Sequence, residues 1–401
     1  MKRFRNYISL MKYYVSLSNL DIIKIYLTIP RKVTDSTEAH LEAAVQWICR
    51  AQDTFNDGGV ARSYSLVYNP FFNRKGWVPS YPETTGYIIP TMFDYAKLSS
   101  SKEIFERAIR MADWECDVQM ENGAVQGGTI DAVPTPAIFN TGQVIFGWVR
   151  AFQETNNQRY LNSAKSAGGF LITHQDGDGA WRSNLSDFAT NKIESYTYNT
   201  RTAWALIYLF DVTKELKYKE AAIKNIEYSI TQQLPNGWFK NNCLFNPAAP
   251  LLHTIAYSLR GILEAGDSLK NERYIDIVKK AADALIERQK EDGSLQGRFS
   301  DKWEPTVPWI CLTGVAQMAI IWGRFYQITG ELKYKDALAK ANRFLKRVQI
   351  LDDKNKDIHG GIAGSYPLNS NYGRFEILNW AVKFFIDSLI IEMKLDNSVK
   401  Y

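Results

Sequence analysis

A short pattern that ends in tyrosine recurs along the chain, and it constrains the fold more than any other feature. The copies are Asn157–Tyr160, Glu215–Tyr218, Asn271–Tyr274 and Glu331–Tyr334, with a looser copy ending at Phe105. Successive copies are about 55 to 60 residues apart, a period typical of repeat architectures. Each unit of such a repeat buries its apolar face on its neighbours, so the repeat predicts one continuous array.

A glutamine and a glycine-containing turn follow each tyrosine. The glutamines, about fifteen residues further on, are Gln119, Gln175, Gln233, Gln289 and Gln349, and Gln52 is an earlier member of the series. Between the tyrosine and the glutamine, apolar residues recur at helical spacing on one side only, which predicts an outer helix. Before each tyrosine lies a nearly continuous apolar run, such as residues 144–149, which predicts a buried inner helix.

The number of units predicts a closed ring. Inner helices are expected to start near Thr85, Thr141, Thr200, His253, Thr313 and Asn379, mostly at threonine or asparagine residues that serve as N-caps. Outer helices are expected to end near the six glutamines. Six inner and six outer helices form an all-α (α/α)6 toroid, in which the last helix, 380–392, pairs with the first outer helix, 38–52.

The repeat favours one domain, although the length alone would allow two. We expect a single toroid domain over residues 37–395 and an N-terminal extension over residues 1–36 that is basic and partly helical. The extension has no uninterrupted apolar core and no small-residue cleavage site, so we predict neither a signal peptide nor a transmembrane segment. Weak contact with a membrane surface remains open, and a cytoplasmic protein is expected.

Composition excludes several classes of function. The formal net charge is only +5 and no Lys/Arg run exceeds two residues, so we expect no nucleic-acid partner. The four cysteines lack CxxC spacing, which favours free buried thiols over disulfides or metal. The four histidines are equally scattered, so we expect no metal site and no cofactor.

Aromatic and amide side chains gather in the loops that precede inner helices or follow outer ones. In a toroid these loops meet at one mouth, where the inner-helix N-termini also converge. Aromatic faces stack on sugar rings and amides bind hydroxyl groups, so the pattern indicates a saccharide-binding cleft rather than a plugged mouth. The expected substrate-binding residues are Trp77, Tyr81, Asn140, Gln143, Trp181, Asn199, Trp238, Asn242, Tyr257, Trp303 and Tyr366.

Residues that break the repeat are better functional candidates than residues present in every copy. Asp178 alternates with asparagine in sister turns and is discounted, as are the glutamines. The candidates for acid–base chemistry are Glu83, Tyr196, Arg201 and His253, with Glu194 as a second carboxylate. His253 is the preferred proton-transfer group because the ordinary pKa of histidine lies near neutrality.

Several segments resemble known proteins. The series Asn140–Gln143, Val149–Thr155 and Arg159–Leu161 resembles carbohydrate-active (α/α)6 toroids, and it is most similar to the helical domain of glucuronyl C5-epimerases. Residues 38–394 also resemble uncharacterised proteins of polysaccharide gene clusters, on the segments Ser80–Tyr87, Leu252–Tyr257 and Gly361–Pro367. The resemblance implies a role in polysaccharide metabolism, with an oligosaccharide, a polysaccharide or a lipid-linked precursor as partner.

Three kinds of function stay open at this point. The first is uronic-acid chemistry, either C5 epimerisation or β-elimination. Arg201, Asn199 or Asn242 would hold the substrate carboxylate, and the base would be His253, Tyr196 or Tyr366. The second is glycoside hydrolysis, which needs two carboxylates, here Glu83 and Glu194. The third is a non-catalytic glycan-binding or assembly module.

Overall fold

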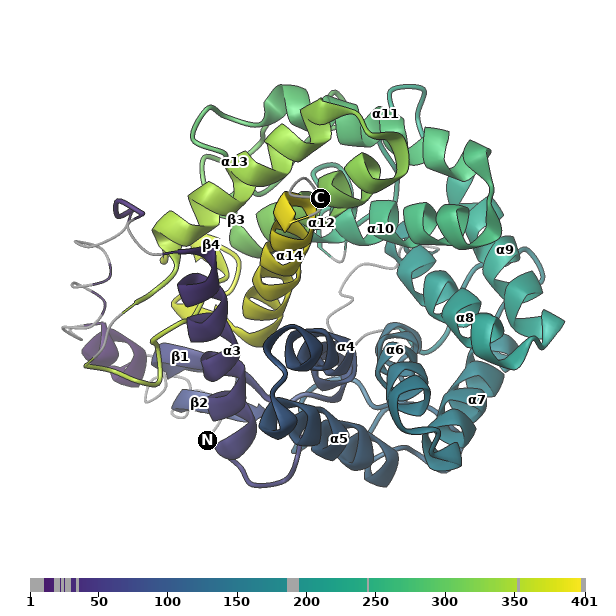
Figure 1. The fold of residues 1–401 in the computed structure, drawn as a ribbon, viewed down its shortest axis with the longest axis horizontal. Helices are drawn as coiled ribbons and strands as arrows, with labels where there is room; N and C mark the ends of the chain where they lie inside the picture. The colour runs from purple at the N-terminus through teal and green to yellow at the C-terminus, as the bar shows by residue number, and fades with distance from the viewer. Residues whose placement is uncertain are drawn as a thin grey trace.

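Twelve α-helices arranged as two concentric layers dominate the computed structural model (Figure 1). The structure describes residues 11–17, 22, 25, 30–33, 36–185, 195–243, 245–351 and 354–397. The inner layer consists of α4 (Pro82–Ser99), α6 (Ile138–Thr155), α8 (Thr200–Thr213), α10 (Leu252–Leu269), α12 (Leu312–Thr329) and α14 (Asn379–Asn397). The outer layer consists of α3 (Thr37–Asp53), α5 (Lys102–Asp117), α7 (Gln158–Thr173), α9 (Leu216–Ile230), α11 (Glu272–Arg288) and α13 (Leu332–Val348). The predicted all-α toroid is confirmed.

The last helix closes the ring. Helix α14 packs between α12 and α4 and also contacts the first outer helix, α3 (Figure 1). Lys346 of α13 completes the closure, because its Nζ lies 3.0 Å from a carboxylate oxygen of Glu392 and donates to the hydroxyl of Thr37 at 2.7 Å. The expected pairing of the final helix with the first outer helix is therefore confirmed.

Each of the six glutamines joins one outer helix to the next. The Nε2 atom of Gln175 donates to the carbonyl oxygen of Gly179 in its own turn at 3.0 Å and to that of Ala221 on α9 at 2.9 Å. Gln349 repeats the arrangement across the closure, with Gly360 and with His40 of α3, both at 3.0 Å. The same pair of bonds recurs at Gln52, Gln119, Gln233 and Gln289.

The turn glycines allow this close approach. Gly293 has φ +91°, and a Cβ on it would lie 1.9 Å from the carbonyl oxygen of Lys340 on the next outer helix. Gly360 would place its Cβ equally close to the carbonyl oxygen of Ala43. A side chain in this left-handed conformation is strained even in open space. The turn therefore requires glycine both for its backbone conformation and for the lack of space around it.

The recurring tyrosines bind in the opposite direction, to the preceding outer helix. The hydroxyl of Tyr160 donates to Asp113 at 2.8 Å, and those of Tyr274 and Tyr334 donate to acidic residues in the same way. Each ring is buried between the layers. In α7, α11 and α13, tyrosine and glutamine thus hold the outer helix from both sides.

The helix-start threonines do not have the expected capping role. Helix α6 begins at Ile138, one turn before Thr141, and α4 begins one turn before Thr85. The Oγ1 atoms of Thr85 and Thr141 instead accept backbone N–H groups of Val60 and Val125 at 2.9 Å. These threonines therefore attach the preceding segment to the inner layer, and the N-cap interpretation was wrong.

Two small sheets add to the helices at the mouth. Strands β1 (Ala61–Asn69), β2 (Arg74–Ser80) and β5 (Glu376–Leu378) pair antiparallel in the order β2-β1-β5. Strands β3 (Ile310–Cys311) and β4 (Ser365–Tyr366) form the second sheet. The β1–β2 hairpin was not expected from the sequence, and its pairing with β5 brings β1 beside the start of α14.

Other sequence expectations concern cysteines, metals and membranes. The four cysteines are free, as expected. Within the described ranges, three or more His, Cys, Asp or Glu side chains do not gather at any point as a metal site would require. The helices of the described chain are each too short or too polar to cross a membrane. Most of the N-terminal extension lies outside the described residues, so the domain boundary stays a prediction.

We expect Gly293→Ala to lower the free energy of unfolding by about 2 kcal/mol or more, because it adds both backbone strain and a backbone clash. Gly177→Ala is the matched control, since a Cβ there meets no atom within 4 Å. Chemical denaturation of both variants measures the difference. Equal stability of the two variants would contradict the role given to the turn glycines.

Candidate functional site

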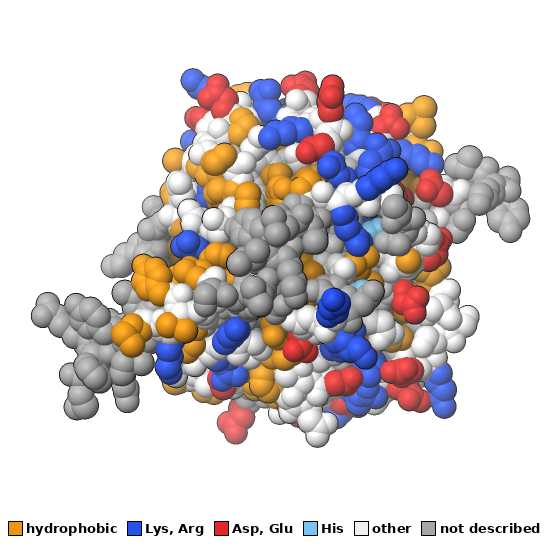
Figure 2. Space-filling model, turned by 90° about the vertical axis from the view of Figure 1, so that its left-hand side faces the viewer, with side chains coloured by type: hydrophobic (Ala, Val, Ile, Leu, Met, Phe, Trp, Pro, Cys, Tyr) orange, Lys and Arg blue, Asp and Glu red, His pale blue; other side chains and the backbone are white. Residues whose placement is uncertain are grey.

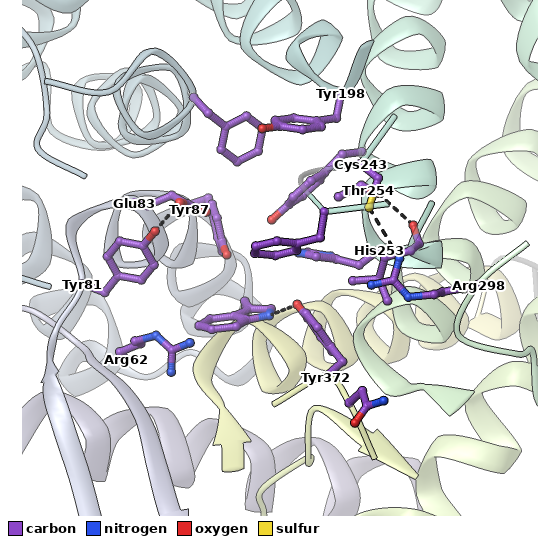
Figure 3. A pocket seen from close by; sticks show the side chains of 16 residues that line it. Arg62, Tyr81, Glu83, Tyr87, Tyr198, Cys243, His253, Thr254, Arg298 and Tyr372 are labelled. Carbon is purple, nitrogen blue, oxygen red and sulfur yellow. Dashed lines mark hydrogen bonds between the residues drawn. The ribbon is translucent and has the colours of Figure 1, made fainter. Parts of the chain in front are cut away.

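A cavity of about 220 Å³ lies at the mouth where the N-termini of the inner helices meet (Figure 3). We call it the mouth cavity. Its aromatic walls come from five places in the chain that the toroid brings together, and they consist of Tyr81, Tyr87, Phe139, Tyr198, Phe245, Tyr257, Tyr372 and Trp380. Its polar lining consists of Arg62, Glu83, Cys243, His253, Thr254, Arg298 and Asn371, and Leu251 completes it.

Glu83 is the one carboxyl group among the described residues that line the mouth cavity. It lies in the first turn of α4, directly after Tyr81 and Pro82. The Tyr81 hydroxyl donates to its Oε2 at 2.6 Å, while Asn140 approaches the same hydroxyl at 3.4 Å. The tyrosine and the amide thereby fix the orientation of the carboxyl group.

Burial raises the pKa of Glu83 to about 7. The hydrogen bond from Tyr81 and the positive charges of Arg201 and Arg62 oppose this rise, but they do not cancel it. The free-energy cost of removing the carboxylate from water exceeds the stabilisation that these partners provide. Glu83 therefore exchanges its proton near neutral pH, as a general acid or base requires.

His253 lines the opposite side of the mouth cavity, in the first turn of α10 (Figure 3). Its Nδ1 lies 2.7 Å from Oε1 of Gln317, which can only accept, so Nδ1 carries the proton and Nε2 is an acceptor. Burial, together with the positive charge of Arg201, lowers the pKa of His253 to about 4, and the hydrogen bond with Gln317 only partly opposes this. The histidine is therefore neutral at pH 7, and the reason for preferring it as the titrating group was wrong.

Arg298 brings a positive charge into the mouth cavity. Backbone pairing of its loop with Leu251, next to the start of α10, holds it in place. Its Nη1 donates to the carbonyl oxygen of Ala249 at 2.8 Å and lies 3.6 Å from Sγ of Cys243. No carboxylate of the described residues lies within ion-pair distance of Arg298, so its charge is available to an anionic ligand.

Arg62 is held by more contacts than Arg298. Its Nη1 donates to Oε2 of Glu376 at 2.9 Å, and its guanidinium group stacks between the rings of Phe72 at 4.7 Å and Trp380 at 4.9 Å. The indole nitrogen of Trp380 in turn donates to the hydroxyl of Tyr372 at 2.7 Å. These contacts make one side of the mouth cavity a rigid aromatic and cationic wall.

Arg201 lies beneath the mouth cavity rather than in its lining. It is 3% exposed, its Nε donates to Oε1 of Gln143 at 2.6 Å, and five aromatic rings surround its guanidinium group at 5.0 to 5.6 Å. It faces a second cavity of about 210 Å³, further along the inner helices, where Lys383 also lies. Tyr87 lines both cavities and separates them.

Four of the residues expected at the site line the mouth cavity, namely Tyr81, Glu83, His253 and Tyr257. Six are buried and do not line the cavity, namely Asn140, Gln143, Tyr196, Asn199, Arg201 and Asn242. Tyr196 stacks on Tyr198, with ring centroids 5.1 Å apart, and so supports a wall without reaching the cavity. The amide of Asn242 accepts a hydrogen bond from Ser258.

Five expected residues lie elsewhere. Trp181 is fully buried in its own repeat. Trp77, which lies on β2, packs on Trp47 of α3. Trp303 donates to the carbonyl oxygen of Asn236 at 3.0 Å, which holds a loop together. Trp238 is buried in the core, and Tyr366 lines a separate small cavity. Glu194 lies outside the described residues.

Sequence reasoning missed the two arginines. Arg62 belongs to the hairpin that was not expected. Arg298 stands five positions after a turn glycine, Gly293, where the sister repeats carry Gly128, Asn184 and Asn242. A cation at a position otherwise occupied by small or amide residues was a break in the repeat that could have been found.

The sequence matches no known protein family and no curated protein. The fold does have counterparts among solved structures. An unsaturated glucuronyl hydrolase specific for heparin superimposes with a TM-score of 0.70 at 16% identity, over 90% of this chain and 98% of that chain. The unsaturated glucuronyl hydrolase of Bacillus sp. GL1 gives 0.71 at 13% identity, over 91% and 98%.

A cellobiose 2-epimerase from Bacillus thermoamylovorans B4167 gives a TM-score of 0.68 at 14% identity, over 88% of this chain and 97% of that chain. All three are similar along nearly their whole length. At such low identity the likeness shows the fold, which this chain shares with (α/α)6 toroids that act on carbohydrates.

We expect the stability of the protein to depend on pH through Glu83. Its pKa is about 7 when folded and has an ordinary value of 4.5, so the folded state keeps a proton that the unfolded chain loses between these values. The stabilisation is complete below pH 4.5 and disappears as the pH rises through 7. Glu83→Gln keeps the group neutral and should gain about 2 kcal/mol relative to the wild type between about pH 5 and about pH 8.

Denaturation of the variant and the wild type at both pH values measures this difference in the free energy of unfolding. The other titrating groups are the same in both proteins, so their contributions cancel. A difference that stays constant with pH would show that burial does not raise the pKa of Glu83.

Proposed function

We propose that the protein is an enzyme of polysaccharide metabolism that transfers a proton at a uronate residue of a saccharide. One observation carries the proposal: the mouth cavity combines a single described carboxyl group, Glu83, with Arg298, whose charge is paired with no carboxylate of the described residues. Arg201 adds a second positive charge just beneath the cavity, also without a carboxylate partner among the described residues. The excess positive charge favours an anionic ligand.

The walls suit a sugar ring. Trp380, Tyr372 and Phe139 offer aromatic faces, and His253, Thr254 and Asn371 offer groups that bind hydroxyls. Sites of this kind are mostly apolar with a few polar groups that fix orientation. Arg298 would hold the sugar carboxylate by paired hydrogen bonds, which a guanidinium group makes better than an ammonium group.

The raised pKa of Glu83 supports a reaction in which it donates a proton. For an unsaturated uronate, Glu83 would protonate C4, and the positive charge that develops at C5 would be taken up by a water molecule. That water returns a proton to the Glu83 carboxylate, so the net change is addition of water to the double bond. The hemiketal formed at C5 then opens, and the bond to the neighbouring sugar breaks. Full-length similarity to unsaturated glucuronyl hydrolases supports this form of the reaction.

Proton abstraction at C5, as in a C5 epimerase or a lyase, is the second candidate. It is favoured by the phenol groups of Tyr198 and Tyr257, which line the mouth cavity together with Glu83. Glu83 would act as the base, and a phenol would return a proton from another direction. Burial raises the pKa of both phenols, so they stay protonated and can serve as acids.

Hydrolysis by two carboxylates receives less support. Glu83 has no second carboxyl group beside it among the described residues of the lining, and Glu194 lies outside them. A non-catalytic binding module would not need a carboxyl group whose pKa is near neutrality.

We expect Glu83→Gln to lower kcat on a uronyl disaccharide by about a hundredfold or more, because it removes the proton-transfer group. Arg298→Gln should instead raise KM for the uronate and leave KM for its neutral methyl ester unchanged. Steady-state kinetics on both substrates measure these effects. Full activity of Glu83→Gln would refute the assignment of this residue.

Reaction in heavy water distinguishes the two candidate reactions. Hydration of an unsaturated uronate should place one deuterium at C4, and activity should fall as the pH rises above about 7, where Glu83 loses its proton. Epimerisation would instead place deuterium at C5, whereas elimination would remove the C5 hydrogen and form a 4,5-double bond. Both reactions would lose activity below that pH. We expect the first result. Release of sugar with neither carbon-bound deuterium nor a new double bond would contradict both and support ordinary hydrolysis.

A further inference from the structure

The tip of the β1–β2 hairpin forms a second hollow directly beside the mouth cavity. The hollow encloses about 280 Å³ and is lined by Phe71, Phe72, Gly128, Thr129, Asp131 and Ala132 together with Arg62 and Tyr81. We call it the hairpin hollow. Figure 2 shows the molecule from the side on which β1 and β2 lie in Figure 1, and hydrophobic side chains gather there beside Lys and Arg side chains.

The two spaces are neighbours, and Arg62 and Tyr81 belong to the linings of both. The Arg62 guanidinium group stands between Phe72 of the hairpin hollow and Trp380 of the mouth cavity, in contact with both rings. A chain that leaves the mouth cavity along Trp380 therefore meets Phe72 next. Glu376 fixes Arg62 in this position, so the shared wall does not depend on a ligand.

The hairpin hollow is built of groups that recognise sugars. Phe71 is 74% exposed although it packs edge-on against Phe72 at 4.8 Å, and burying such an aromatic face is favourable. Across the hollow, the Asp131 carboxylate accepts a hydrogen bond from the Thr129 hydroxyl at 2.7 Å, and its Oδ2 lies 3.6 Å from Nη2 of Arg74. It therefore keeps further acceptor sites for hydroxyl groups.

We propose that the hairpin hollow binds the second sugar residue of a substrate whose first, uronate residue occupies the mouth cavity. The proposal rests on the proposed function and deepens it, because it makes the substrate at least a disaccharide. Tyr81, which lines both spaces, donates to Glu83, so the proton-transfer group lies beside the boundary between the two spaces.

Calorimetric titration of the full-length protein tests the inference. The probes are glucuronic acid and a glucuronyl disaccharide, in saturated and 4,5-unsaturated forms. The variants Phe71→Ala and Asp131→Asn alter only the hairpin hollow. Phe55→Ala, an exposed phenylalanine on the turn after α3, is the matched control. We expect the wild type to bind the disaccharide more tightly than the monosaccharide, and each variant to weaken the disaccharide alone by about fivefold to tenfold.

Each other outcome has a distinct meaning. If both sugars bind the wild type equally, or if the variants bind the disaccharide as the control does, the hairpin hollow is not a sugar site and the mouth cavity stands alone. If no probe binds the wild type while its helical circular dichroism is intact, the proposed function fails and this inference fails with it.

Discussion

The amide group of one glutamine in each repeat is the contact on which the rest of the structure depends. In each repeat its nitrogen atom bonds simultaneously to the turn below its own outer helix and to the next outer helix. Gln349 makes the same pair of bonds with His40, where the two ends of the toroid meet, so all six junctions have one geometry. Every glutamine is followed by a loop that runs to the mouth. The clamp thereby fixes the starting point of each segment that supplies a site residue.

The electrostatics of the mouth cavity follow from that geometry. A ring of inner helices directs its N-termini at one space, which favours negative charge, and Arg201 lies below among aromatic rings. Glu83 is nevertheless enclosed by Tyr81, Tyr87 and Tyr257, and the cost of dehydration outweighs these attractions. Because nearby positive charges favour the ionised form of Glu83 and burial opposes it, the carboxyl group changes protonation near neutral pH. Arg298 provides the matching positive charge without neutralising Glu83 in an ion pair.

The repeat predicted the toroid because one period fixes both the pairing of helices and the closure. The repeat did not predict the positions of the site residues equally well. Loop aromatics such as Trp181 and Trp303 look the same in a sequence whether they face a ligand or hold a loop, and the difference lies in backbone turns that only the fold shows. Glu83 and His253, in the first turn of an inner helix, do line the mouth cavity, because the helix fixes their direction. The hairpin was missed because its strand, residues 61–69, alternates only partly, and Arg62 was missed with it.

The account makes the mouth cavity a uronate site centred on Glu83 and Arg298. A crystal structure of the Glu83→Gln variant with a 4,5-unsaturated glucuronyl disaccharide tests this most directly, because the variant should bind but not turn over. The account predicts the sugar carboxylate within hydrogen-bond distance of the Arg298 guanidinium group, and the ring between Trp380 and the position-83 amide. A disaccharide bound outside the mouth cavity, or bound in it with the carboxylate turned away from Arg298, would contradict it.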